Sequence, residues 1–230
     1  MTATVRGNEL ARPPVATAVT TGRIVSVNVG QARAVDRNGT PATTAIWKHP
    51  IAGRVAARGV NLEGDEQADR SVHGGPDKAL YAYAVEDTAW WEGELGRELG
   101  PGAFGENLTI RGIDPSLAVV GERWAAGSAL LEVSEPRLPC WKLGLRFGDA
   151  GFVRQFTRAA RSGTYLRIAQ EGDLGAGDEI RVVDHPAHRV TVGDIWRIYH
   201  RDRDSASALL DVPELSAGWR EWAEQHVARR

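Results

Sequence analysis

The stretch VVGERWAAGSALLEVS (residues 119–134) places short apolar runs between glycines, which is typical of β-strands joined by tight turns. The stretch RIVSVNVG (residues 23–30) sets β-branched residues in alternation and ends in a glycine, so it predicts another strand. Glycines punctuate further short stretches in the same way: GVNLEGDEQAD, HGGPDKALYAY, FGENLTIRGI, TYLRIAQEG and GAGDEIRVV. Many short strands with glycine turns predict a mostly β fold, either a barrel or a sandwich.

Helical spacing interrupts these strands twice. The stretch VEDTAWWEGELG (residues 85–96) places Val85, Ala89, Trp90 and Leu95 roughly on one face of a helix. The stretch DAGFVRQFTRAARSG (residues 149–163) has the same apolar spacing and closes at a glycine, where helices commonly end. The fold class expected is therefore α+β with strands in the majority.

The chain is expected to divide into three parts. Residues 1–21 mix Thr, Ala, Arg and Pro without any period and predict a flexible tail. Residues 22–186 hold the predicted strands and would form the barrel domain. Residues 187–230 would form a small module of three helices, with plausible N-caps at Thr191, Asp204 and Ser216.

The overall composition indicates a soluble globular protein and argues against nucleic acid as a partner. Of the 230 residues, 42% are hydrophobic and 25% are charged, with a formal net charge of −2. A small helical module at the C-terminus invites comparison with DNA-binding helices. However, residues 189–230 contain seven Arg and seven Asp or Glu, so they lack the basic stripe that nucleic-acid binding requires.

The single cysteine and the absence of targeting signals set further limits. One cysteine makes no internal disulfide, which favours a reducing cytoplasm, and it cannot hold an iron–sulfur cluster. The apolar runs are too short for a membrane helix, and the N-terminus has no signal-peptide core. The sequence also lacks the glycine-rich fingerprints of dinucleotide and ATP sites.

That cysteine, Cys140, lies in SEPRLPCWKLGLRFG (residues 134–148), between stiff and cationic neighbours. Prolines restrict the backbone before it, and nearby cations favour a thiolate; the cations are Arg137, Lys142 and Arg146. Free cysteines are often merely small buried hydrophobes. This setting instead favours a nucleophile or a ligand for a soft metal.

Two further motifs combine glycine with polar residues. In HGGPDKAL (residues 73–80), Gly74 and Gly75 allow a ligand close to the backbone, and His73 and Lys78 flank them. A tight turn with solvated charges is the alternative for this motif. In FGENLTI (residues 104–110), the polar side chains either point into a pocket or cap a turn; they are Glu106 and Asn107.

A third group of residues suits an anion that carries phosphate. Tyr165 and Arg167 alternate along the strand predicted in SGTYLRIAQEG. Together with Lys48, Arg137, Lys142 and His73, Arg167 would surround such an anion, and the fork of arginine matches phosphate oxygens.

These motifs in this order resemble the MOSC domain family. The resemblance rests on GDEQAD, HGGPDKALYAY, GAFGENLTI, VVGERW, EPRLPCWKL, SGTYLRI and GAGDEI. It covers about residues 23–183 and is close to the bacterial YiiM-type subgroup, whose C-terminal three-helix module the tail also resembles. Each motif alone is weak, but their common order is specific.

The resemblance implies a MOSC-type β-barrel that binds molybdenum cofactor, a pterin dithiolene with a terminal phosphate. It makes Cys140 the molybdenum ligand and gives functional roles to His73, Gly74 and Gly75, to residues 104–107 and to Arg167. It also implies reduction of N-hydroxylated compounds, such as N-hydroxylated purine bases. Within that reading, Glu106 or His73 would deliver protons and Asn107 would orient the substrate. Because the chain has no flavin fingerprint, electrons would come from a separate flavin or iron–sulfur protein.

Two other functions stay open at this stage. The first is a carrier of molybdenum cofactor, or of persulfide sulfur on Cys140. The second is a cysteine hydrolase or thiol sensor without metal. The sequence also leaves open whether the aromatic residues of the tail pack on the barrel or on a second chain of a homodimer; they are Trp196, Tyr199, Trp219 and Trp222.

Overall fold

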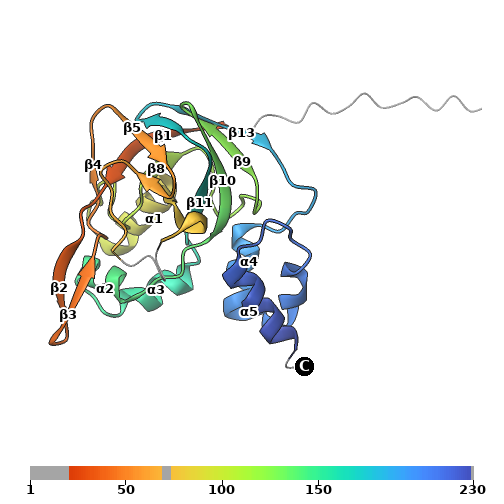
Figure 1. The fold of residues 1–230 in the computed structure, drawn as a ribbon. Coiled ribbons are helices and arrows are strands. Elements are labelled where there is room, and N and C mark those ends of the chain that lie inside the picture. Colours follow the sequence, from red (N-terminus) through yellow and green to blue (C-terminus); the bar gives the residue numbers. More distant parts are fainter. Residues whose placement is uncertain (1–20, 69–73, 229–230) are drawn as a thin grey trace, which may run out of the picture.

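Seven strands close into a barrel because β1 (Thr21–Val29) is hydrogen-bonded on both of its sides (Figure 1). Its first residues pair with β13 (Glu179–Asp184), and residues 23–27 pair with β8 (Leu108–Arg111). The other barrel strands, in order from β13, are β9 (Arg123–Ala126), β10 (Ala129–Pro136), β11 (Thr164–Gln170) and β7 (Leu80–Ala84). The prediction of a mostly β barrel is therefore confirmed.

The computed structural model describes residues 21–68 and 74–228 of the chain. The predicted flexible tail lies outside the described residues except for its last position, Thr21, which begins β1. His73 also lies outside them.

Short strands extend this barrel. The two-residue β4 (His49–Pro50) pairs with β1. A three-stranded sheet contains β12 (Gly172–Gly175), β5 (Arg54–Arg58) and β6 (Asn61–Leu62). A hairpin of β2 (Arg33–Arg37) and β3 (Thr40–Thr44) projects from the molecule (Figure 1). The 3-10 turn η1 (Pro76–Lys78) follows Gly75, whose φ of 91° lies in a region that favours glycine.

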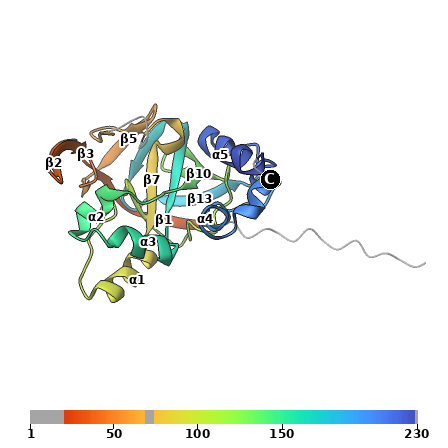
Figure 2. The same cartoon turned by 90° about the horizontal axis from the view of Figure 1, so that it is seen from below.

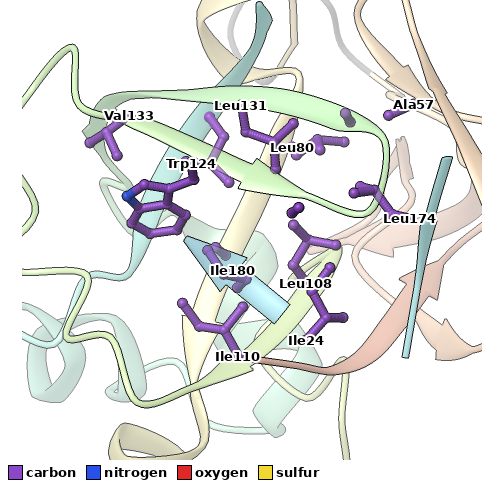
Figure 3. Close-up of a cluster of buried hydrophobic side chains, with 14 of the residues drawn as sticks. Ile24, Ala57, Leu80, Leu108, Ile110, Trp124, Leu131, Val133, Leu174 and Ile180 are labelled. Carbon is purple, nitrogen blue, oxygen red and sulfur yellow. The ribbon is translucent and has the colours of Figure 1, made fainter. Parts of the chain in front are cut away.

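Alternating apolar side chains fill the interior of the barrel (Figure 3). Ile24, Leu108, Trp124, Leu131 and Ile180 come from five different strands, and all are buried. Every second side chain of a strand faces inward, so the alternating apolar residues of these strands meet in one core.

Three short helices carry a second, aromatic cluster outside the barrel. They are α1 (Val85–Leu95), α2 (Trp141–Phe147) and α3 (Phe152–Ala159), and they gather on one side in Figure 2. The first and third match the helices expected from the sequence, whereas α2 was not expected. Trp91 of α1 lies against Phe152 and Phe156 of α3, with ring centroids 4.9 and 6.0 Å apart.

The C-terminal module consists of α4 (Val192–Arg201), the 3-10 helix η2 (Arg203–Leu209) and α5 (Ala217–Val227). Thr191 caps α4 as expected, in a capping box with Asp194. The expected cap at Asp204 is wrong, because the middle segment is a 3-10 helix that begins at Arg203 and has Asp202 at its N-cap position. Ser216 occupies the expected N-cap position of α5, but its hydroxyl makes no capping hydrogen bond.

The module packs against the rest of the chain through two groups of residues. Val120, in the turn that precedes β9, joins a cluster with Ile195, Leu209 and other apolar residues of the module. Trp196 of α4 instead meets Phe156 of α3, with centroids 6.4 Å apart. Trp196 therefore packs within the chain itself. None of the helices in the described ranges is long and apolar enough to cross a membrane.

Removal of the tryptophan side chain inside the barrel should weaken the barrel strongly. Trp124 is fully buried, and its indole N–H donates to Glu122 at 2.6 Å. We expect Trp124→Ala to lower the free energy of unfolding by about 3–5 kcal/mol, because it leaves a cavity and removes the hydrogen bond to one oxygen of Glu122. Urea unfolding measures this loss. The control Leu117→Ala, at a side chain that is 70% exposed, should change stability by less than about 0.5 kcal/mol.

Candidate functional site

A pocket of about 90 Å³ brings together most of the site residues expected from the sequence. Its lining combines cations, polar groups and one thiol, contributed by segments that are distant in sequence. The expected residues that line it are Lys48, Lys78, Asn107, Arg137, Cys140, Lys142 and Tyr165. The barrel strands bring these segments to one place, so the site depends on the closed fold.

Cys140 lies between the end of β10 and the start of α2. Its backbone is extended, and its carbonyl oxygen accepts a hydrogen bond from the N–H of Leu143 at 2.9 Å, which begins the helical turn. The thiol is free and half-buried. Cys140 therefore reaches a pocket wall while its backbone is held by the helix that follows.

Arg137 places a buried positive charge beside this thiol. The residue is only 7% exposed, and its guanidinium donates to the carbonyl oxygen of Phe104 and lies 4.9 Å from the ring centroid of Tyr81. Burial alone lowers the pKa of Arg137, but Tyr81, Tyr165 and Cys140 together raise it above its ordinary value. Within residues 21–68 and 74–228, no carboxylate forms an ion pair with it. A bound anion would supply the missing negative charge.

Lys48 has a carboxylate partner that the sequence reasoning missed. It forms a buried ion pair with Asp65, which also accepts hydrogen bonds from the N–H of Gly30 at 2.7 Å and from the side chain of Asn107 at 2.9 Å. Burial lowers the pKa of Lys48, although Asp65 opposes that shift. Asp65 belongs to GDEQAD, which is part of the resemblance, but an acid-rich turn gave no sign that one member enters the pocket.

Glu106 and Asn107 have different positions although they are neighbours. Asn107 lines the pocket, and its Oδ1 accepts a hydrogen bond from the N–H of Tyr81 at 3.1 Å. Glu106 is 1% exposed and accepts hydrogen bonds from the N–H groups of Gly102 and Phe104 at 2.6 and 3.0 Å. Burial raises its pKa. In this structure Glu106 holds the loop around it and does not line the pocket.

The loop around Glu106 requires glycine at position 105. The φ of Gly105, 77°, is in the left-handed region, and a Cβ there would lie 2.9 Å from Cγ1 of Ile46. A larger residue would push against the pocket wall, because Ile46 lines the pocket.

Arg167 is not brought to this pocket. It donates to Asp77 at 2.6 Å, to Glu132 at 2.7 Å and to the carbonyl oxygen of Glu214 at 2.9 Å. These bonds tie β10, η1 and the C-terminal module to β11. The guanidinium of Arg167 thus binds carboxylates of the protein itself. The sequence had instead predicted that Arg167 would bind a cofactor phosphate.

A second cavity, of about 390 Å³, lies between the barrel and the C-terminal module. Gly74 lines it, together with η1, the end of β10 and aromatic residues of α4 and α5. Lys78, Leu138 and Tyr165 line both cavities, so the two adjoin. The pocket around Cys140 therefore opens beside a second cavity, and the C-terminal module forms one wall of that cavity.

Comparison with known proteins identifies the family. Residues 69–181 match the MOSC domain, and residues 190–230 match the YiiM-like 3-alpha helix domain. The uncharacterized protein YflK of Bacillus subtilis is 34% identical over 200 residues, which cover 86% of this chain and 90% of that protein. The chain belongs to the MOSC family. The matched MOSC range contains Cys140 and about half of the residues that line the pocket, while the three-helix module completes the second cavity.

Other relatives of this MOSC protein agree with that assignment. The protein YiiM of Escherichia coli is 33% identical over 183 residues, with 76% of this chain and 81% of that protein covered. A protein of Gibberella moniliformis named "Reductase" is 31% identical over 181 residues, which are 77% of this chain but 32% of that protein. The crystal structure of YiiM from Geobacillus stearothermophilus has a TM-score of 0.75 at 32% identity, covering 90% and 99% of the two chains.

The buried carboxyl of Glu135, in the second cavity, should make stability depend on pH. Burial raises its pKa above the usual 4.5, although Lys78 and Ser216 oppose the shift. The folded protein therefore holds this proton more tightly than the unfolded chain, so stability is lost as pH rises above about 4.5. As the pH rises from about 4.5 to the raised pKa of Glu135, we expect the free energy of unfolding of Glu135→Gln to increase relative to that of the parent. Above the raised pKa, the difference between the two proteins should stay constant. Urea unfolding between about pH 4 and pH 8 measures the difference, and a constant difference would contradict the assignment.

Proposed function

We propose that this protein is a molybdenum-cofactor-dependent reductase of N-hydroxylated compounds. The observation that carries the proposal is the pairing of one accessible thiol with a buried arginine that has no carboxylate partner among the described residues. MOSC domains are generally associated with molybdenum cofactor, and one relative is named a reductase. Both facts support the proposal.

The side chains of the pocket suit this cofactor. Within the described part of the chain, no group of three or more His, Cys, Asp or Glu is arranged to hold a metal. A metal at Cys140 must therefore bring most of its own ligands. Molybdenum cofactor does so through its dithiolene sulfurs, and a thiolate is the soft ligand that the protein adds. Its phosphate would be bound chiefly by Arg137 and Lys142, since Lys48 and Lys78, which also line the pocket, already pair with Asp65 and Glu135.

When bound, the cofactor supplies a redox centre that removes the oxygen of an N–OH group with two electrons. The chain would hold this centre through the Cys140 thiolate and would bind the anionic part through the cations of the pocket. Asn107 is fixed by Asp65 and the N–H of Tyr81, so it presents a rigid polar group to the pocket. Burial raises the pKa of Tyr165 to about 12, so its hydroxyl stays protonated and can donate a hydrogen bond.

Reduction of R–NHOH to R–NH₂ and water consumes two electrons and two protons. Of Glu106 and His73, we propose His73 for proton delivery, since Glu106 is enclosed by its own hydrogen bonds. An alanine at position 73 that leaves turnover unchanged in the loaded protein would contradict this role.

Loss of the thiol should remove the metal. We expect protein made in a host that synthesises molybdenum cofactor to contain near-stoichiometric molybdenum and to reduce N-hydroxylated substrates with an artificial electron donor. Cys140→Ala should lose the metal and the turnover, because no other soft ligand lines the pocket among the described residues. Elemental analysis, pterin fluorescence and turnover are measured together.

Two outcomes would contradict the reductase proposal. Retained pterin without molybdenum in both proteins would favour a carrier of the cofactor. Rapid alkylation of Cys140, with activity that does not depend on molybdenum, would favour a thiol hydrolase or sensor.

We also propose that the electrons come from a separate flavin or iron–sulfur protein, because this chain has one cysteine and no flavin fingerprint. The loaded protein should therefore be inactive with a nicotinamide cofactor alone and become active when an extract fraction with such a donor is added. Steady turnover with NADH or NADPH and purified protein would contradict this proposal.

A further inference from the structure

The second cavity has an aromatic wall that the C-terminal module provides. Tyr199 comes from α4, and Trp219 and Trp222 lie three residues apart on α5. The ring of Tyr199 lies 5.2 Å from Trp219 and 5.3 Å from Trp222, centroid to centroid. Such side chains offer broad, stiff apolar faces, on which a planar ring stacks with little loss of side-chain entropy. The size of the cavity, about 390 Å³, is in the usual range for small-molecule sites.

The buried carboxylate of Glu135 lines the same cavity and can accept further hydrogen bonds. Glu135 accepts a hydrogen bond from the hydroxyl of Ser216 at 2.5 Å and pairs with the Lys78 ammonium at 3.4 Å. A carboxylate offers about four acceptor positions, so these two partners do not exhaust it. The group that complements such a carboxylate is an amidine-like edge, with a ring N–H beside an amino group, which donates two parallel hydrogen bonds.

We propose that this cavity binds the planar heteroaromatic ring of the substrate, with its amidine-like edge on Glu135 and its face on Trp222 and Tyr199. This inference rests on the proposed reductase function and deepens it. The adjoining pocket holds Cys140, and Tyr165 and Leu138 line both spaces, so a ring in the cavity has the reacting pocket beside it. The C-terminal module is then the part of the chain that selects the ring.

Isothermal titration calorimetry with 2-aminobenzimidazole, a planar ring with an amidine-like edge, tests the cavity without any turnover. We expect saturable binding of one molecule per chain to protein prepared without cofactor. Glu135→Gln, which keeps the side-chain volume, should weaken binding at least about tenfold, the effect of losing hydrogen bonds to a charged group. Trp222→Ala should weaken it by about tenfold through the loss of stacking.

Matched controls make this result specific. Glu179→Gln removes an exposed carboxylate of β13 outside the cavity and should leave binding unchanged. Indole, which has the size of the probe but only one N–H donor, should bind more weakly than the probe to the parent and lose little on Glu135→Gln. Circular dichroism confirms that each variant is folded. No saturable binding to the parent, or equal binding by the parent and Glu135→Gln, would overturn the inference.

The pterin of the cofactor is also a planar ring with an amidine-like edge, so a further measurement separates the two sources. If the cavity belongs to the substrate, cofactor-loaded protein binds 2-aminobenzimidazole as tightly as cofactor-free protein. Loss of probe binding on loading would assign the cavity to the pterin and overturn the inference. Turnover without probe binding would overturn only this inference. Probe binding without molybdenum or turnover would overturn the reductase proposal and leave a ring-binding cavity whose ligand is not a reductase substrate.

Discussion

The rest of the structure depends on the two-sided pairing of β1, which hydrogen-bonds to β8 along one edge and to β13 along the other. This pairing closes the sheet and removes its free edges. Closure also fixes where the loops leave the barrel, because each strand is held in register with two neighbours. The segments around residues 48, 65, 107 and 140 meet for that reason and not because of any local preference.

Closure allows the protein to bury charges that would be costly in an open sheet. Asp65 receives the Lys48 ammonium, a backbone N–H and the side chain of Asn107, so its carboxylate is well satisfied. Arg137 is different, because its protein partners are a carbonyl oxygen and an aromatic ring. A cation buried in this way creates a positive potential beside Cys140. Such a potential would favour the anionic ligand proposed above, and burial of this charge is costly to stability without a partner of opposite charge.

The C-terminal module packs on the barrel at the same place where it lines the second cavity. Its apolar residues cover Val120 and the region of α3, while Arg167 and Glu135 reach from the barrel to its backbone and to Ser216. The hydroxyl of Ser216 is directed to a barrel carboxylate instead of its own helix. Contacts of this kind hold the aromatic residues of α5 in the wall of the second cavity, so the ring selection proposed above would depend on the module and not on Cys140.

The sequence by itself determined the strand-rich class, the helices at residues 85–96 and 149–163, and the cationic surroundings of Cys140, because these follow from local period and composition. The order of motifs also determined the family. Only the tertiary structure decided that Arg167 bonds to protein carboxylates, that Glu106 is enclosed and that Asp65 enters the pocket. The reason is physical: a side chain's direction and partners depend on which distant strands close around it. The cavity between barrel and module depended on that closure as well, since its walls come from segments more than 100 residues apart.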